Sequence, residues 1–302
     1  MKTAVMKSAV MKSAVTKNVI TVGVDGTPHA LAAATWAAHE ARLRQSRLRL
    51  LTAWEPLTAR PRGAPWTQEI PHWPDRIIEE ARATVESAEP GIPIDVSLVR
   101  EPPLEALVEA AEQADLLVLG SRGLGPAARF TLGETGLDLV PRVDIPVVLV
   151  RARHDRPATE GSSGVAVGVS LHAPGDALLA FAFETAARRA VPLRAVHGRN
   201  LPPFAYDRGG AAERAAAEQA ELLAREELSE ALRPWREKFR DVRVEQQVVM
   251  ESPAPALLHG AAGTQLLIVG RRHLGRAVPR IGHVVHAAVH HAPCPVAVVP
   301  HE

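Results

Sequence analysis

Glycines punctuate residues 116–135, LLVLGSRGLGPAARFTLGET, at a spacing that suits phosphate binding. Gly120, Gly123 and Gly133 stand in this segment, and Arg122 adds a positive charge. Glycine lets backbone amides approach a phosphate closely, and the helix expected near Gly133 would favour an anion at its N-terminus. The same glycines also fit a tight strand-to-helix turn, so both interpretations stay open on this segment alone.

A carboxylate follows another apolar strand. The segment VGVDGTP places Asp25 at its carboxyl end. In an open parallel sheet, ligands bind beyond the carboxyl ends of the strands, where the strand order reverses. For a strand order 3-2-1-4-5 this crevice lies between the first and fourth strands, so Asp25 would face the glycine-spaced loop. A carboxylate there can accept hydrogen bonds from a base or a ribose, which favours a nucleotide site over turn chemistry.

Alternating apolar strands and amphipathic helices predict the sheet that positions these residues. Segments that are apolar throughout, such as LLVLG and VVLV, suit a parallel sheet covered on both faces. The first part of the chain predicts strands near 19–24, 48–53, 94–99, 115–120 and 146–150, and helices near 28–45, 74–88, 102–113 and 134–142. The second part predicts strands near 165–170, 192–197, 242–249, 265–270 and 295–299.

The chain repeats itself. REPPLEALVEAAEQADLLVLGSRG, which ends at Gly123, aligns without a gap to MESPAPALLHGAAGTQLLIVGRRH, which ends at His273. We therefore expect two tandem doubly wound α/β domains, each a five-stranded parallel sheet with helices on both faces. The predicted divisions are a disordered extension at 1–17, a first domain at 18–152, a polar linker at 153–164 and a second domain at 165–302.

Composition narrows the class of protein. The 302 residues include 35 basic and 34 acidic ones, for a formal net charge of +1. This balance gives no reason to expect a nucleic-acid or membrane partner. The lone Cys294 fits a reducing compartment, and no run approaches the roughly 20 apolar residues of a membrane span, so we expect a cytoplasmic protein.

At these residues the sequence resembles the universal stress protein family in its tandem two-domain form. The nucleotide-binding copies of that family carry a G-x2-G-x9-G-[S/T] loop and an Asp after the first strand. Gly120, Gly123 and Gly133 stand in that spacing, and GVDGTP supplies Asp25. The resemblance implies a Rossmann-like fold of the adenine nucleotide alpha hydrolase type. It also implies regulatory ATP binding, by the first domain only, in a general stress response.

The resemblance assigns roles to individual residues. Asp25 would lie near the adenine and ribose, and Ala53 would line the adenine pocket through its backbone. The three loop glycines would hold the ribose and phosphates. Glu134 departs from the pattern, which expects Ser or Thr there. Either its carboxylate occupies the anion site itself and weakens ATP binding, or it helps to hold Mg²⁺ while Thr135 donates to phosphate.

The second copy departs further from the pattern. Ser170 stands in place of Asp25, and His273 stands in place of Gly123. The span to Gly282 is one residue shorter, and His283 follows it. We therefore expect a copy that is degenerate for ATP and structural in role. It would pair with the first copy through the last strands as an intramolecular pseudo-dimer, and a homodimer is a further alternative.

Other residues admit two interpretations. His283, His286 and His290 share a helix face, with His273, His291 and Cys294 nearby, which suggests a metal site or, as we favour, surface histidines. For Cys294 we favour a packed small side chain over a redox sensor. Trp54, Trp66 and Trp73 flank a Pro-rich segment, where packing is favoured over a roof above adenine. The segment from Ala211 predicts a long packed amphipathic helix.

Three classes of function follow. The first is a regulatory adenine-nucleotide-binding protein, and the second is a nucleotide-free scaffold that acts through protein partners. The third is an enzyme on the same fold. The sequence offers no nucleophile–base pair and no Walker lysine, so at most slow ATP hydrolysis is expected, with no residue to name as its base.

Overall fold

The structure, a computed structural model, describes residues 17–55, 73–121, 133–152, 163–172, 175–200, 211–272 and 281–302. We call residues 17–152 the first half and residues 163–302 the second half. The predicted extension at 1–17 and the linker at 153–164 fall almost entirely outside the described residues, so these boundaries stay a prediction.

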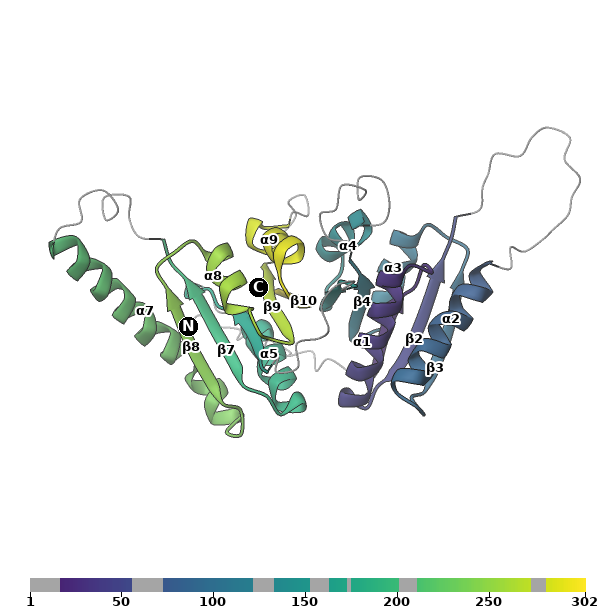
Figure 1. The fold of residues 1–302 in the computed structure, drawn as a ribbon, viewed down its shortest axis with the longest axis horizontal. Coiled ribbons are helices and arrows are strands. Elements are labelled where there is room, and N and C mark those ends of the chain that lie inside the picture. Colours follow the sequence, from purple (N-terminus) through teal and green to yellow (C-terminus); the bar gives the residue numbers. More distant parts are fainter. Residues whose placement is uncertain are drawn as a thin grey trace, which may run out of the picture.

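Each half is a doubly wound α/β unit in which strands alternate with helices (Figure 1). The elements of the first half are β1 (Val19–Gly23), α1 (Pro28–Arg44), β2 (Arg47–Ala53), α2 (Trp73–Ala88), β3 (Ile94–Val99), α3 (Pro103–Ala111), β4 (Leu116–Gly120), α4 (Gly133–Leu139), the 3-10 helix η1 (Val140–Arg142) and β5 (Val147–Val150). Those of the second half are β6 (Val165–Gly168), α5 (Asp176–Arg189), β7 (Leu193–Gly198), α7 (Ala211–Lys238), β8 (Val244–Val249), α8 (Pro253–Gly260), β9 (Leu266–Arg272), α9 (His283–His291) and β10 (Val296–His301).

All ten strands form one sheet in the order β3-β2-β1-β4-β5-β10-β9-β6-β7-β8. Within each half the strands are parallel, and the expected order 3-2-1-4-5 is confirmed twice. The halves meet where β5 and β10 pair antiparallel, with Ala297 opposite Val148. The order reverses between β1 and β4, and again between β6 and β9, so each half has its own crevice at the carboxyl ends of these strands.

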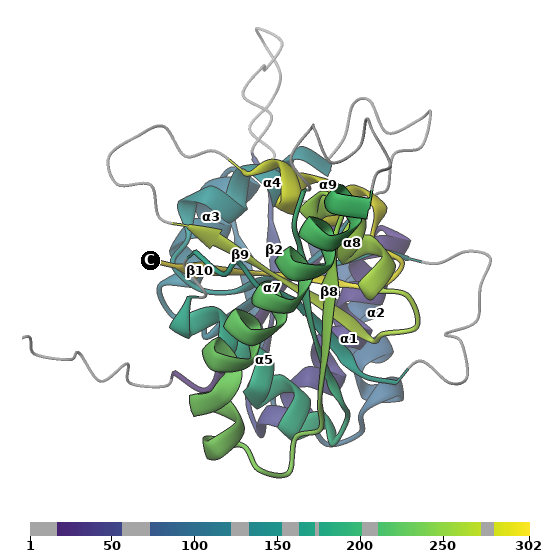
Figure 2. The ribbon, with the colours of Figure 1, turned by 90° about the vertical axis from the view of Figure 1, so that its left-hand side faces the viewer.

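Helices cover both faces of this sheet, as Figure 2 shows from the side of α7. One buried cluster joins α1, α2, α5 and α7 to one face, and a second joins α3, α4, α8 and α9 to the other. The sheet-facing side of α1 is a run of buried alanines, which lets this helix lie close to the strands. Thr27 caps its N-terminus ahead of Pro28, a residue favoured at the first helical position.

Several boundaries differ from the predicted ones by one to three residues, and two of these differences have a clear physical reason. The helix expected near 134–142 ends at Leu139 and continues as η1, because Pro141 has no N–H to donate to an α-helical turn. The last strand, expected near 295–299, runs on to His301, since β9 pairs with it as far as Arg272.

Helices α1 and α5 join the halves through a buried ion triad. Glu40, which is 2% exposed, accepts hydrogen bonds from Arg44 on its own helix and from Arg189 on α5. The guanidinium of Arg44 also lies over the ring of Phe181, with its Cζ 5.0 Å from the ring centroid. The guanidinium of Arg189 lies over the ring of Trp36, with its Cζ 5.5 Å from that ring's centroid. These contacts are related by the repeat, since Arg44 and Arg189 end equivalent helices.

Two further arginines cross between the halves. Arg151 donates from its guanidinium to the carbonyls of Val289 and His290, at the C-terminal end of α9, over 2.8 and 2.9 Å. Arg271 of β9 donates to the carbonyl of Val143, which follows η1, over 2.7 Å. Burial lowers the pKa of Arg271, and the charge of Asp144 acts in the opposite direction. Each half thus supplies a cation to the end of a short helix in the other.

Candidate functional site

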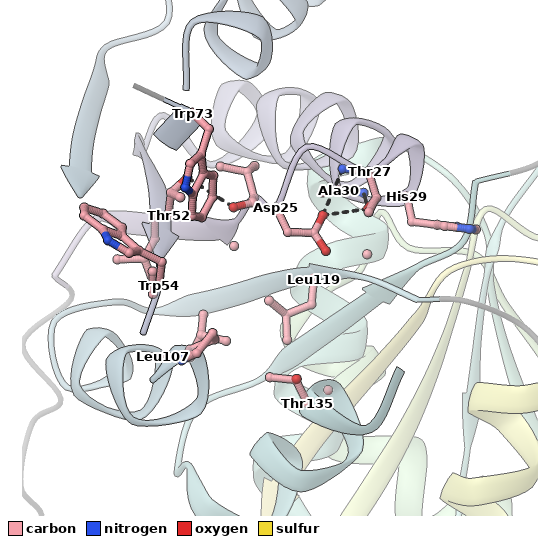
Figure 3. A pocket seen from close by; sticks show the side chains of 17 residues that line it. Asp25, Thr27, His29, Ala30, Thr52, Trp54, Trp73, Leu107, Leu119 and Thr135 are labelled. Atoms are coloured by element: carbon pink, nitrogen blue, oxygen red, sulfur yellow. Dashed lines mark hydrogen bonds between the residues drawn. The ribbon is translucent and has the colours of Figure 1, made fainter. Parts of the chain in front are cut away.

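The first half has a cleft of about 330 Å³ at the carboxyl ends of its central strands (Figure 3). It opens at the reversal point between β1 and β4, where the sequence predicted a ligand. Its lining comes from the ends of β1, β2 and β4 and the starts of α1, α2 and α3, with two residues of α4. A volume near 300 Å³ lies at the lower end of the range for small-molecule pockets.

Asp25 is held in a fixed orientation by its own turn. Its Oδ1 accepts hydrogen bonds from the Thr27 backbone N–H at 3.0 Å and from the Thr27 hydroxyl at 2.6 Å. That hydroxyl accepts in turn from the N–H of Ala30, over 3.3 Å, as the cap of α1. Gly26 has a φ of 76°, which the turn requires and which glycine adopts without strain.

The other oxygen of Asp25 is available to a ligand. Among the described residues, none forms a hydrogen bond to Oδ2, and Figure 3 shows the carboxylate between α1 and the Leu119 side chain, facing the cleft. A carboxylate that is oriented by one oxygen and open at the other can accept hydroxyl or amino hydrogens without first being reorganised.

Aromatic and apolar side chains form one end of the cleft. Trp54 and Trp73 meet edge to face, with ring centroids 6.1 Å apart, and both line the cleft. Trp73 packs on Trp54, as favoured from the sequence, and it is also 42% exposed. Leu51 and Leu107 line the adjoining wall. This end offers flat aromatic rings and apolar surface to a planar ring system. Trp66 lies outside the described residues.

Gly120 has a packing role that needs no ligand. A Cβ built on it would lie 2.5 Å from the backbone carbon of His29 and 2.7 Å from the N of Ala30. Only glycine therefore allows the end of β4 to lie against the first turn of α1. At Gly120, the close packing of a strand on a helix is therefore sufficient reason for glycine.

The predicted site residues are brought together in part. Asp25, Ala53, Gly120 and Thr135 all line the cleft, although they come from four different elements or turns. Gly133 and Glu134 are the first residues of α4. Arg122 and Gly123 lie outside the described residues.

Sequence reasoning missed Thr27, Thr52 and His29, which also line the cleft. Thr27 was recognisable as a helix cap before Pro28. Thr52 is buried and donates its hydroxyl hydrogen to the carbonyl of Val24, over 3.1 Å, which ties the ends of β1 and β2 together. His29 accepts at Nδ1 from the N–H of Ala152, over 3.2 Å, and no local pattern signals this contact.

The second copy keeps a cleft at the equivalent place. Ser170, Gly282 and His283, the counterparts named from the sequence, line it together, and His273 lies outside the described residues. Its volume is about 690 Å³, so the departures from the family pattern have not filled the crevice.

The histidines of α9 do not gather into a recognisable metal centre. His286 and His290 have ring centroids 4.3 Å apart, while His283 lines the second cleft. Within the part of the chain that the structure describes, no group of three or more His, Cys, Asp or Glu side chains is placed to hold a metal ion. Cys294 is half-buried, with its Sγ 3.6 Å from the Thr264 hydroxyl.

Comparison with known proteins identifies the family. The model of the universal stress protein family matches residues 18–151 and again residues 164–300. The chain belongs to the universal stress protein family. Two universal stress proteins of Mycobacterium tuberculosis are similar to it over 92% of its length. Rv2005c is 30% identical and matched over 95% of its own chain, and Rv2624c is 28% identical and matched over 94%.

The fold is shared with solved members of the family. The crystal structure of a universal stress protein from Archaeoglobus fulgidus superposes with a TM-score of 0.63, covering 94% of this chain and 98% of the other. At 18% identity this similarity concerns the fold alone. Across the described ranges, none of the helices combines the length and apolar character needed to cross a membrane.

Proposed function

We propose that this universal stress protein binds ATP, or a related adenine nucleotide, in the cleft of its first half and acts as a regulator in a general cytoplasmic stress response. The observation that carries the proposal is the open Oδ2 of Asp25 at the strand-order reversal. Ligands of open α/β sheets bind at this place.

Each part of the cleft suits one part of the nucleotide. Asp25 would accept hydrogens from the ribose hydroxyls or the base. Ala53, the last residue of β2, would meet the adenine through its backbone, and Trp54 and Trp73 would contact the ring, since bases stack well on aromatic side chains. Thr135 would donate its hydroxyl to a phosphate. The phosphate site predicted from the sequence also includes Arg122, Gly123 and Gly133.

The contacts between the halves support an intramolecular pseudo-dimer as the working unit. β5 pairs with β10, and Glu40 bridges arginines of both halves in a buried site. The alternative function, a nucleotide-free scaffold that acts alone or as a homodimer, is also compatible with these contacts. It does not explain an oriented carboxylate in an aromatic-lined cleft. For this reason we favour nucleotide binding. Enzymatic activity beyond slow ATP hydrolysis is not part of the proposal.

Substitution of Asp25 by Asn tests the proposal. Loss of hydrogen bonds to a charged acceptor, at about 1.5–3 kcal/mol, should weaken ATP binding by roughly 10- to 100-fold in titration calorimetry. Asp241→Asn removes one carboxylate from the exposed turn before β8 and serves as the matched control. Equal affinity for ATP in the wild type and Asp25→Asn, or no binding to either, would favour the scaffold.

Substitution of Glu134 by Ser tests the departure from the family loop. A hydroxyl in place of a carboxylate beside the phosphates should strengthen ATP binding about three- to tenfold when Mg²⁺ is absent, because a like charge is removed. The titration is then repeated with Mg²⁺. A loss of affinity confined to the Mg²⁺ experiment would instead assign Glu134 to the metal, as the second hypothesis requires.

A further inference from the structure

The second half contains a cleft whose chemistry differs from that of the first. It lies at the carboxyl ends of β6, β7 and β9 and the starts of α8 and α9, with a volume of about 690 Å³ against about 330 Å³. Both clefts therefore occupy the same place in the repeated fold. Their equivalent strands allow the lining residues to be compared position by position.

Residues at equivalent strand ends have changed their charge. β1 and β6 end at Gly23 and Gly168, and two residues later the carboxylate of Asp25 is replaced by the hydroxyl of Ser170. β2 and β7 end at Ala53 and Gly198, and the next residue changes from Trp54 to Arg199. The second cleft has thus lost the acid, and it has gained a cation where the first has an aromatic ring.

Further basic groups surround the same opening. Arg272 ends β9, and His283 begins α9, at the position where α4 has Glu134. Arg199, Arg272 and His283 are all exposed at the cleft. Among the described lining residues, Glu227 is the one carboxylate, against three arginines and four histidines. These basic residues are Arg199, Arg271, Arg272, His172, His197, His283 and His301.

A buried imidazole lies at the base of the cleft. His301 is 7% exposed, and a Cβ built on Gly270 would lie 2.4 Å from its Nε2. Gly270 is the equivalent of Gly120, which packs directly on the backbone of α1. In the second half the His301 ring takes that place, and it also lies against Gly175, just before α5. Gly270 therefore faces the polar Nε2 of an imidazole, whereas Gly120 faces the backbone of His29 and Ala30.

We propose that the second cleft is a separate binding site for a phosphate-rich small molecule, which it recognises through its anionic groups and not through a base or ribose. Arg199 and Arg272 would pair with phosphate oxygens, since the guanidinium group matches phosphate geometry with two parallel hydrogen bonds. Ser170 can donate a hydrogen to such an oxygen, whereas a carboxylate in its place would repel it. The site stands independently of the nucleotide proposed for the first cleft.

Titration calorimetry with inorganic tripolyphosphate, on the full chain without Mg²⁺, tests the site. We expect one molecule bound per chain. The double variant Arg199→Gln/Arg272→Gln should weaken this binding by about 10- to 100-fold, because two charge-assisted contacts are lost. Both arginines are exposed, so the fold should tolerate the change. Ser170→Asp keeps both arginines and should also weaken binding, by repulsion.

The matched control is Arg240→Gln/Arg243→Gln, which removes the same charge from exposed positions before the start of β8, at the opposite end of the sheet. It should change the affinity less than twofold. Absence of tripolyphosphate binding to the wild type would overturn the proposal, as would an equal loss in the control. A gain in tripolyphosphate affinity in Asp25→Asn, with no loss in Arg199→Gln/Arg272→Gln, would assign the anion to the first cleft, because Asp25→Asn removes a repelling charge there. The nucleotide proposal is judged separately, by ATP binding to that same Asp25 variant.

Discussion

The two clefts of this molecule share a fold but differ in their chemistry. Each lies at the reversal point of a five-stranded parallel unit with the order 3-2-1-4-5. The first presents an oriented carboxylate and two tryptophans, and the second presents arginines and histidines in a cleft of larger volume. The strand order determines where a ligand can bind, whereas a few residues at the strand ends determine what that ligand can be.

The largest expected effect concerns the contact that holds the two halves together. Glu40→Ala leaves the largely buried Arg44 and Arg189 without their shared carboxylate, which should lower the free energy of unfolding by about 3 kcal/mol. Urea denaturation followed by circular dichroism measures this loss. Glu86→Ala removes a carboxylate that pairs with Arg82 on the exposed surface of α2 and should cost less than about 1 kcal/mol. Similar losses in both variants would show that the triad does not stabilise the joined halves.

A smaller effect should distinguish the two equivalent glycines. Gly120→Ala forces a methyl group against the backbone of α1 and should cost about 1–3 kcal/mol. Gly270→Ala meets chiefly the His301 ring, a side chain that can shift more easily than the backbone atoms opposite Gly120, and should cost less. Urea denaturation of both variants without nucleotide makes the comparison. If Gly270→Ala were the more destabilising, the contact of Gly120 with the backbone of α1 would not be the less tolerant of the two.

The smallest expected effect is an acid sensitivity of the second half. Burial lowers the pKa of His290, and the charges of His286, His291 and Arg151 lower it further. The unfolded chain therefore binds this proton more readily than the folded one. The contribution of neutral His290 to the free energy of unfolding is fully present above the pKa of the unfolded chain, near 6.5. It is lost as the pH falls through that value toward the lowered pKa of the folded protein. The equivalent segment of the first half, residues 133–142, has no histidine.

Melting temperatures of the wild type and His290→Gln between pH 7.5 and 5 would measure this effect. The variant should lose less stability on acidification than the wild type. His259→Gln, on the exposed surface of α8, is the control and should follow the wild type. Parallel curves for all three proteins would contradict the assignment to His290.

Much of the fold was predictable because its signals are local. Apolar runs such as LLVLG predicted buried parallel strands, and the repeat predicted two equivalent units. The place of Asp25 in the lining of the cleft was predictable because strand order alone puts the end of β1 at the crevice. These inferences needed no knowledge of contacts between distant segments.

The remaining features depend on such contacts. Trp54 and Trp73 meet across a segment of intervening chain, and no local pattern predicts that the two rings contact each other. Glu40 belongs to the alanine-rich face of α1, and its partner Arg189 comes from the other half. The change from Trp54 to Arg199 became visible only when the ends of β2 and β7 were compared. These three features are set by tertiary packing, which the spacing of apolar residues along the sequence does not reveal.

The position of β10 has a consequence for synthesis of the chain. The first half can fold once β5 is made, but the partner of β5 begins only at Val296. At about 5–20 residues per second, the apolar edge VVLV stays open for roughly 7–30 s after its own half has left the ribosome. During this interval the nascent first half offers a strand edge to any neighbour, including another nascent copy on the same messenger RNA.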